Sequence, residues 1–432
     1  MHRLLVRSFC TATNIAKKES VVVIGTGWAG YKFLQDISAD KYDITIISPR
    51  NHFVFTPLLA STSVGTLEFR SISEPIRRLG KKEEYYEAFA KDIDTEKKTV
   101  FCESALNNNT FNVPYDKLII ASGAVSNTFN TPGVYEHAFF LKELADARKI
   151  RQRIIDCFEI ASEPGLSLED KKAVLHFAVV GGGPTGVELS AEIHDFIRYD
   201  MTKLYPHLMG IPKLTVYDVA EKILGSFDSK LGEYATKKFK RDGTEVKTGT
   251  KIKEIQKDKL ILADNSEIRV GMVVWATGLG PIEFTKKLHF AKDKSQRLLT
   301  DGLLRVFNEK REPFNDIYAL GDCATVENYN LPQTAQVAQQ KGYYLAKAFN
   351  KHSISPNYFP SPFVYRHRGA MAYIGDWNAL IDSPTHFKGT GRFAWVIWRS
   401  SYLTMTVSWR NKILIPAYWF MTWAFGRDTS RF

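Results

Sequence analysis

The chain has 432 residues, of which 44% are hydrophobic and 24% are charged. These values allow two or three domains with cores of their own and exclude a disordered chain. The formal net charge of +11 lies mainly at the two ends: residues 1–18 carry four bases and no acid, and residues 386–432 carry seven bases and one acid. A diffuse nucleic-acid-binding surface would spread its charge along the chain, so no nucleic acid partner is predicted.

No uncharged apolar run reaches the length of about 18 residues that a spanning helix needs, so no transmembrane helix is predicted. The four cysteines, Cys10, Cys102, Cys157 and Cys323, form no closely spaced pair. A disulfide framework or an adjacent redox-active dithiol is therefore not expected.

Residues 1–18 contain two arginines, one serine and two threonines and no acid. This composition is typical of a mitochondrial transit peptide, which is removed after import. The alternative is an N-terminus without fixed structure or targeting role.

The first motif, Val21–Gly30, places a hydrophobic strand before Gly25, Gly27 and Gly30 and then a helix. Glycines at this spacing allow a tight turn, close approach of a pyrophosphate to the backbone, and a helix N-terminus aimed at the negative charge. The motif therefore predicts a dinucleotide site.

The next strand, Ile44–Ile47, ends at Ser48, where such folds usually carry an acid for the adenosine ribose. Ser48 or the region of Arg50 must hold that ribose in another way. The aromatic and apolar loop at residues 51–59 contains Thr56 and Pro57. A loop of this kind beside a cofactor site could cover an isoalloxazine ring; the alternative is a loop buried in the core.

A second motif repeats the first, with a strand, the glycines Gly181, Gly183 and Gly186, and a helix that carries Glu188. Each motif also has a distant strand that ends in small residues, which let the chain pass under a cofactor. These residues are Ala121, Ser122 and Gly123 for the first motif and Ala276, Thr277 and Gly278 for the second. Two dinucleotide sites in one chain suggest that electrons pass from one cofactor to another.

A helix from Lys142 to about Ile160 is predicted to link the two halves. The strand Leu214–Asp218 ends in an acid, which accepts hydrogen bonds from a ribose 2′-OH and repels a 2′-phosphate. Asp218 therefore favours NADH over NADPH. Residues 195–212 are expected to extend the preceding helix.

The strand from Asp316 ends in Gly321 and Asp322, and an acid placed there can bind the ribityl chain of a flavin. The helix that opens after Pro332 carries Gln336 and Gln340 one turn apart on one face. Their uncharged amides suit a quinone carbonyl; the alternative is a solvated helix face.

The tail holds five of the eight tryptophans. On a helix from Phe393, one face would carry Trp395, Trp398, Tyr402 and Met405; a second helix is expected to begin near Pro416 and to carry Trp419 and Trp423. Tryptophans flanked by basic residues suit an amphipathic element in a bilayer interface. The alternative is packing on the protein's own body or on a dimer partner.

These motifs together resemble the two-dinucleotide-binding-domain flavoprotein superfamily and, within it, the type II (alternative) NADH:quinone oxidoreductases of mitochondria. The most specific stretches lie at residues 48–59, 181–188, 335–340 and 408–412. The resemblance implies an α/β fold with two Rossmann-like dinucleotide-binding domains and a C-terminal amphipathic helical membrane-anchoring region. The expected parts are a transit peptide at 1–18, a discontinuous FAD-binding domain at 19–140 and 285–349, an NADH-binding domain at 165–284, and the anchoring domain at 350–432.

The resemblance also implies the roles of residues. The Gly25 motif would bind FAD, with Asp322 on the ribityl chain and Thr56 and Pro57 near the ring. The Gly181 motif would bind NADH, with Asp218 on the ribose and Glu188 near the nicotinamide–flavin stack. Gln336 and Gln340 match the family's quinone-site pair, and Ser48 is what this branch usually shows in place of the acid.

The implied activity is hydride transfer from NADH to FAD and passage of two electrons to ubiquinone, without proton pumping, at the surface of the mitochondrial inner membrane. The sequence does not show which face of the inner membrane the protein occupies or whether it forms a homodimer. No calcium-binding loop is present, and no metal site is predicted.

One rival is a sulfide:quinone oxidoreductase, which would need a cysteine pair near the flavin. The other is an apoptosis-inducing-factor-like redox signalling flavoprotein that binds nucleic acid, against which the nearly neutral middle of the chain argues.

Overall fold

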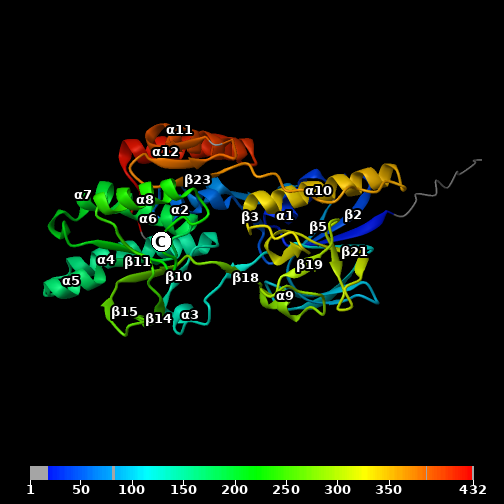
Figure 1. The fold of residues 1–432 in the computed structure, drawn as a ribbon, viewed down its shortest axis with the longest axis horizontal. Coiled ribbons are helices and arrows are strands. Elements are labelled where there is room, and N and C mark those ends of the chain that lie inside the picture. The colour runs from blue at the N-terminus through cyan, green and yellow to red at the C-terminus, as the bar shows by residue number, and fades with distance from the viewer. Residues whose placement is uncertain (1–17, 80–82, 386, 431–432) are drawn as a thin grey trace, which may run out of the picture.

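The computed structural model describes residues 18–79, 83–385 and 387–430. Two α/β halves lie side by side, and the C-terminal helices α11 (Gly391–Met405) and α12 (Trp409–Phe425) run along the upper edge of one of them (Figure 1). The mixed α/β fold class is confirmed. Cys10 and all but the last residue of the predicted transit peptide lie outside the described part of the chain.

The first half is built on a ten-stranded sheet in the order β22-β19-β20-β21-β8-β1-β2-β5-β6-β7. Its centre is parallel, with β1 between β2 and β8 and with β21 beside β8. The buried residues Val21–Val23 of β1 explain the continuous hydrophobic run there. The strands are β1 (Glu19–Ile24), β2 (Tyr42–Ser48), β5 (Glu84–Asp94), β6 (Thr99–Ser104), β7 (Thr110–Pro114), β8 (Lys117–Ile120), β19 (Leu298–Thr300), β20 (Arg305–Phe307), β21 (Pro313–Ala319) and β22 (Ala324–Val326).

Helices α1 (Trp28–Asp36) and α10 (Ala335–Ile354) pack closely against each other in this half. A Cβ at Gly342 of α10 would lie 2.4 Å from the carbonyl oxygen of Ala29, so only glycine allows this approach. Residues from both ends of the chain thus complete the same half.

The second half contains a five-stranded sheet in the order β10-β17-β11-β12-β13, and all of its pairings are parallel. The strands are β10 (Phe139–Phe140), β11 (His176–Val180), β12 (Lys213–Tyr217), β13 (Glu245–Lys247) and β17 (Met272–Trp275). The predicted linker helix is present as α4 (Leu144–Ser162). Helix α6 (Pro184–Phe196) continues through a π-helical turn, Ile197–Met201, into α7 (Thr202–Leu204), so the predicted extension toward residue 212 ends before Pro206.

The C-terminal region forms a small sheet of β23 (Ala370–Tyr373), β24 (Ala379–Asp382) and β25 (Lys388–Thr390), followed by α11 (Gly391–Met405) and α12 (Trp409–Phe425). The prediction that the last helix begins near Pro416 was wrong. Ser408 caps the helix at Trp409, with its side-chain oxygen accepting a hydrogen bond from the Asn411 N–H at 3.2 Å. Pro416 lies inside the helix.

Two residues of the predicted lipid-facing stripe of α11, Trp398 and Tyr402, pack on the protein. Trp398 is only 3% exposed, and Tyr402 lies edge-on to both Trp398 and Phe55. The alternative of packing on the body therefore holds for Trp398 and Tyr402, whereas Met405 of the same stripe is 50% exposed. Within the described residues, no helix is long and apolar enough to cross a membrane.

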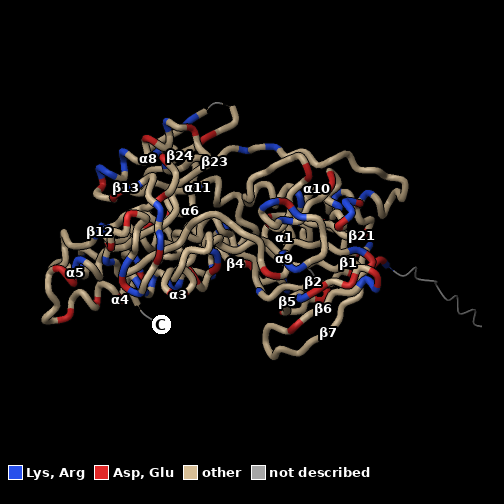
Figure 2. Tube along the Cα trace, turned by 60° about the horizontal axis from the view of Figure 1, so that its bottom comes forward, with Lys and Arg blue, Asp and Glu red and all other residues tan. Residues whose placement is uncertain are grey.

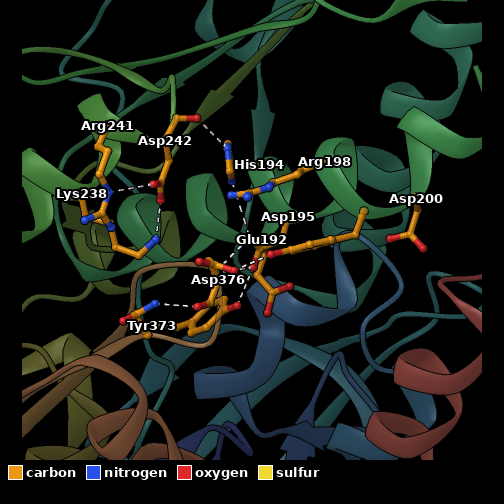
Figure 3. Close-up of polar contacts among 12 residues, drawn as sticks. Glu192, His194, Asp195, Arg198, Asp200, Lys238, Arg241, Asp242, Tyr373 and Asp376 are labelled. Atoms are coloured by element: carbon orange, nitrogen blue, oxygen red, sulfur yellow. Dashed lines mark hydrogen bonds and ion pairs between the residues drawn. The ribbon is translucent and has the colours of Figure 1, made fainter. Parts of the chain in front are cut away.

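Helix α6 holds the C-terminal region through three carboxylates on one face: Glu188, Glu192 and Asp195. Asp195 accepts hydrogen bonds from the Tyr373 hydroxyl and from the Asp376 N–H at 3.1 Å, as Figure 3 shows. Glu192, which is buried, accepts hydrogen bonds at 2.7 Å from the hydroxyls of Ser61 and Thr66.

The same face is closed by Arg427 from the tail. Its guanidinium lies 2.7 Å from Asp200 and 3.6 Å from Glu192. The C-terminal region is thus fixed beside the second glycine motif by buried charges.

Candidate active site

The two glycine motifs form the same turn at the end of a central strand. Gly25 has φ +97° and Gly181 has φ +119°, conformations that L side chains rarely adopt. A Cβ at Gly30 would lie 2.1 Å from the Gly25 oxygen, and one at Gly186 would lie 1.9 Å from the Gly181 oxygen. These last glycines therefore let helices α1 and α6 pack against their turns.

The distant strands meet these turns in the same way. A Cβ at Gly25 would lie 2.3 Å from the Ala121 oxygen, and one at Gly181 would lie 2.4 Å from the Ala276 oxygen. The N–H groups of Ala121 and Ala276 each bond the last residue of the glycine strand at 2.8 Å. The duplication seen in the sequence is therefore a duplication of geometry.

A single cavity of about 1700 Å³ joins the two turns. Most pockets for one small molecule measure roughly 300–1,000 Å³, so this cavity has room for more than one ligand. A Cβ at Gly27 or Gly183 would meet no atom within 4 Å, which leaves space in front of both helix N-termini for phosphate. The residues present fit two dinucleotides.

Most of the predicted cofactor residues border this cavity. They are Gly25, Gly27, Ser48, Arg50, Thr56, Pro57, Ala121, Ser122, Gly123, Gly321 and Asp322 on one side and Gly181, Gly183, Glu188, Asp218, Ala276, Thr277 and Gly278 on the other. Gly30, Gly186, Gln336 and Gln340 are not among the bordering residues.

The Ser48 hydroxyl is used within the protein. It lies 2.9 Å from the Thr26 hydroxyl and donates to the Arg50 carbonyl at 3.2 Å. The Arg50 guanidinium forms an ion pair with Glu143, which caps helix α4. On the neighbouring strand, Glu87 stands in register with Ser48 and borders the cavity.

The 51–59 loop borders the cavity and is held by Trp28, whose indole N–H donates to the Thr56 hydroxyl at 2.9 Å. Also on the cavity lining, the Asp322 carboxylate lies 3.8 Å from the Lys142 ammonium. These two contacts hold parts of the cavity lining in the first half.

In the second half, the Asp218 carboxylate is oriented by the backbone. It accepts hydrogen bonds from the N–H of Gly182 and from that of Ala220 at 2.7 Å. The carboxylate therefore stands beside the second glycine turn.

Glu188 is half-buried on the cavity wall. Its carboxyl accepts hydrogen bonds from the Tyr373 N–H at 3.1 Å and the Trp398 indole at 3.4 Å. Burial raises the pKa of this carboxyl from 4.5 to about 8. The two hydrogen bonds oppose this rise, and the negative charge of the nearby Glu192 adds to it. At neutral pH the group is therefore mostly protonated.

The C-terminal region adds two residues to the cavity that the sequence analysis did not identify, Met371 of β23 and Tyr402 of α11. With Leu59 and Ala60 they make one end of the cavity apolar. Tyr402 belongs to the predicted aromatic stripe, whose spacing does not indicate the surface that it faces, and Met371 has no signal in the sequence.

The two predicted quinone-site glutamines bond to the backbone of the segment that follows their helix. The Gln336 amide donates to the Gly369 carbonyl at 2.7 Å, and the Gln340 amide donates to the Arg366 carbonyl at 2.9 Å. A direct contact of these amides with quinone stays a prediction.

The three described cysteines, Cys102, Cys157 and Cys323, are buried and free. Burial raises the pKa of Cys102 to about 12 and that of Cys157 to about 11. Thiols in this state are poor nucleophiles, which disfavours the sulfide-oxidising rival.

Comparison with known proteins gives two family matches. Residues 19–342 match the pyridine nucleotide-disulphide oxidoreductase family, and residues 367–428 match the NDH2 C-terminal domain. A probable NADH dehydrogenase of Dictyostelium discoideum is 43% identical over 97% of this chain and 92% of its own length.

A mitochondrial internal alternative NAD(P)H-ubiquinone oxidoreductase A1 of Arabidopsis thaliana is 40% identical over 97% of this chain and 87% of its own length. The solved structure of NDH2 from Plasmodium falciparum in complex with NADH superposes with a TM-score of 0.89 at 28% identity. It covers 96% of this chain and 100% of that chain.

Proposed function

The chain belongs to the type II (alternative) NADH:quinone oxidoreductases of the pyridine nucleotide-disulphide oxidoreductase family, and from this premise we propose how its residues divide the reaction. The enzyme oxidises NADH and reduces ubiquinone with FAD as its cofactor. The observation that carries the proposal is the one cavity that joins both glycine turns to an apolar end. FAD, when bound, accepts a hydride from NADH and passes two electrons to the quinone.

We assign FAD to the first half, residues 19–140 with 285–349, and NADH to residues 165–284. The turn at Gly25 and the N-terminus of α1 would hold the FAD pyrophosphate, and Asp322 the ribityl chain. The turn at Gly181 would hold the NADH pyrophosphate, with Asp218 on the ribose. Both assignments rest on the open space before the two helix N-termini.

Glu188 is placed to position the substrates rather than to act as an obligatory base, since its raised pKa keeps the carboxyl mostly protonated at neutral pH. The ring of Tyr402 and the side chains of Leu59 and Met371 form an apolar wall at the same end of the cavity. This wall suits a quinone ring and excludes water from it.

The outer face of α12 fits a membrane surface. Trp409, Ile413, Phe420 and Trp423 follow helical spacing on one face and are all exposed. Arg410 and Lys412 lie on either side of this stripe, where they can meet anionic headgroups. We propose that this face binds the mitochondrial inner membrane and brings the apolar end of the cavity close to the quinone pool.

The test is steady-state NADH oxidation by the FAD-loaded protein with and without a short-chain ubiquinone. We expect a rate that depends on the quinone and is much slower with NADPH than with NADH. A rate that does not respond to quinone would contradict the proposal. Sulfide-dependent quinone reduction without NADH would favour the sulfide-oxidising rival instead.

A further inference from the structure

Residues 355–369, here called the strap, run from the end of α10 back to β23. The strap lies antiparallel along α10 and is held by side chains one turn apart. The Tyr344 hydroxyl donates to the Ser361 carbonyl at 2.7 Å, and Gln340 exchanges two hydrogen bonds with the Arg366 backbone at 2.9 and 3.0 Å. Gln336 then bonds the Gly369 carbonyl. The strap is thus a fixed surface of the protein.

The outer face of α10 and the strap expose several large side chains. Phe363 of the strap turns inward and is 5% exposed, whereas Phe359 is 86% exposed and Val364 is 70% exposed. At about 100° per residue, Tyr343, Lys347, Lys351 and Ile354 fall on the side of α10 opposite its buried face. Apolar and cationic side chains therefore share this surface.

The charge of this surface has one sign. Residues 328–375 contain five lysines and arginines and no aspartate or glutamate. Lys341 is buried, so the positive charge of the surface comes from Lys347, Lys351, Arg366 and Arg368. In Figure 2 the segment that leads from α10 to β23 carries blue and no red.

This surface lies on the same side of the molecule as the last two helices. Figure 1 shows α10 along the upper edge of the first half and α11 and α12 along the upper edge of the second. The cavity is bordered by Ala335 and Ala338 of α10 and by Tyr402 of α11. Helices from the sides of both surfaces therefore border the same cavity.

We propose that the strap and the outer face of α10 form a second membrane-binding surface, which takes up anionic lipid. The protein would then sit on the bilayer at two places, α12 on one side and the strap on the other, with the apolar end of the cavity between them. Exposed apolar residues beside bases that lack acids match a lipid surface. A symmetric contact with a second copy would bring equal charges together.

The inference rests on the proposed function in one respect, namely that the outer face of α12 binds the membrane. The direct test measures partition of the FAD-loaded protein onto vesicles of phosphatidylcholine with cardiolipin. We expect the double variant Phe359→Ser/Val364→Ser to bind at least about tenfold more weakly than the wild type, because two apolar side chains lose their burial. The matched control Leu106→Ser/Leu168→Ser removes exposed leucines on other elements and should bind like the wild type.

The charge contribution is tested separately. The variant Lys347→Gln/Lys351→Gln should bind cardiolipin vesicles more weakly and with a smaller dependence on salt, and pure phosphatidylcholine vesicles as the wild type does. NADH oxidation with a short-chain, water-soluble quinone should be unchanged in every variant. If the wild type shows no quinone-dependent NADH oxidation, the proposed function is contradicted. Vesicle binding would still decide the inference about the strap.

A probe at the surface guards against indirect effects. In a protein with Cys10→Ser, the other cysteines are buried, so Val364→Cys can carry an environment-sensitive fluorophore. Its emission should shift to the blue on anionic vesicles, whereas a fluorophore at Leu106→Cys should not respond. Equal vesicle binding by all variants, or a change of oligomeric mass in place of vesicle binding, would overturn the inference.

Discussion

Replacing Glu188 by glutamine tests the burial of its carboxyl. The folded protein holds this group with a pKa of about 8 against 4.5 in the unfolded chain. Between these two values the folded state binds the extra proton, so stability falls as pH rises from about 4.5 to 8 and then levels. At 1.36 kcal/mol per pKa unit, the cost at pH 7 is at most about 3 kcal/mol. The amide of the variant would keep the acceptor for Tyr373 and Trp398 without this cost.

We therefore expect Glu188→Gln and the wild type to have similar free energies of unfolding near pH 4.5 and the variant to be the more stable at pH 7. The assay is urea unfolding of the FAD-loaded proteins across this range, with the exposed Glu169→Gln as a control. Parallel pH curves for wild type and Glu188→Gln would refute the reasoning. If NADH affinity and the rate of flavin reduction are also unchanged, the proposed positioning role is wrong.

Three further substitutions probe other parts of the site. Arg427→Ala leaves Asp200 without its buried partner at 2.7 Å and should cost about 3–5 kcal/mol, measured by thermal unfolding; a loss typical of a surface arginine would contradict the packing. Gly30→Ala puts a Cβ 2.1 Å from the Gly25 oxygen and should yield protein without flavin absorbance; a fully loaded variant would show that the turn can adjust. Tyr402→Ala should raise the KM for quinone about tenfold and leave the KM for NADH unchanged, because it removes one aromatic wall; an effect on NADH alone would place the quinone elsewhere.

The cofactor turns could be predicted from the sequence because their chemistry is local. Gly25 and Gly181 need positive φ, and Gly30 and Gly186 need the absence of a Cβ, which short spacing rules express directly. Each motif is also accompanied by a distant strand that ends in small residues, at 121–123 and at 276–278, so the same pattern occurs twice in the sequence. These features required no knowledge of tertiary packing.

The C-terminal end of the site could not be predicted in this way. Periodicity identified the stripe with Trp398 and Tyr402 but not the surface that it meets, and it packs on Phe55 instead of lipid. The sequence predicts Trp423 on the outward face of α12 but misses Trp409 and Ile413, because the Ser408 cap and not Pro416 sets the start of the helix.

The glutamines show the same limit. Their spacing predicted a shared face, which is correct for Gln336 and Gln340, but not that this face would lie under a returning segment. Both side-chain amides donate hydrogen bonds to backbone carbonyls of that segment, at residues 369 and 366. A bonding partner more than twenty residues away leaves no trace in helical spacing.

The position of Arg427 also has a consequence for the order of folding. Its contacts to Asp200 join residues 227 apart, and β21 completes the first sheet from far beyond β8. Until the last residues have been delivered, Glu192 and Asp200 lack their cation. The first sheet lacks four of its ten strands only until residues 298–326 have been delivered. The second half can therefore not finish folding while the chain is still emerging from a ribosome or a translocation pore, and chains that stop short of Arg427 should remain substrates for chaperones and proteases.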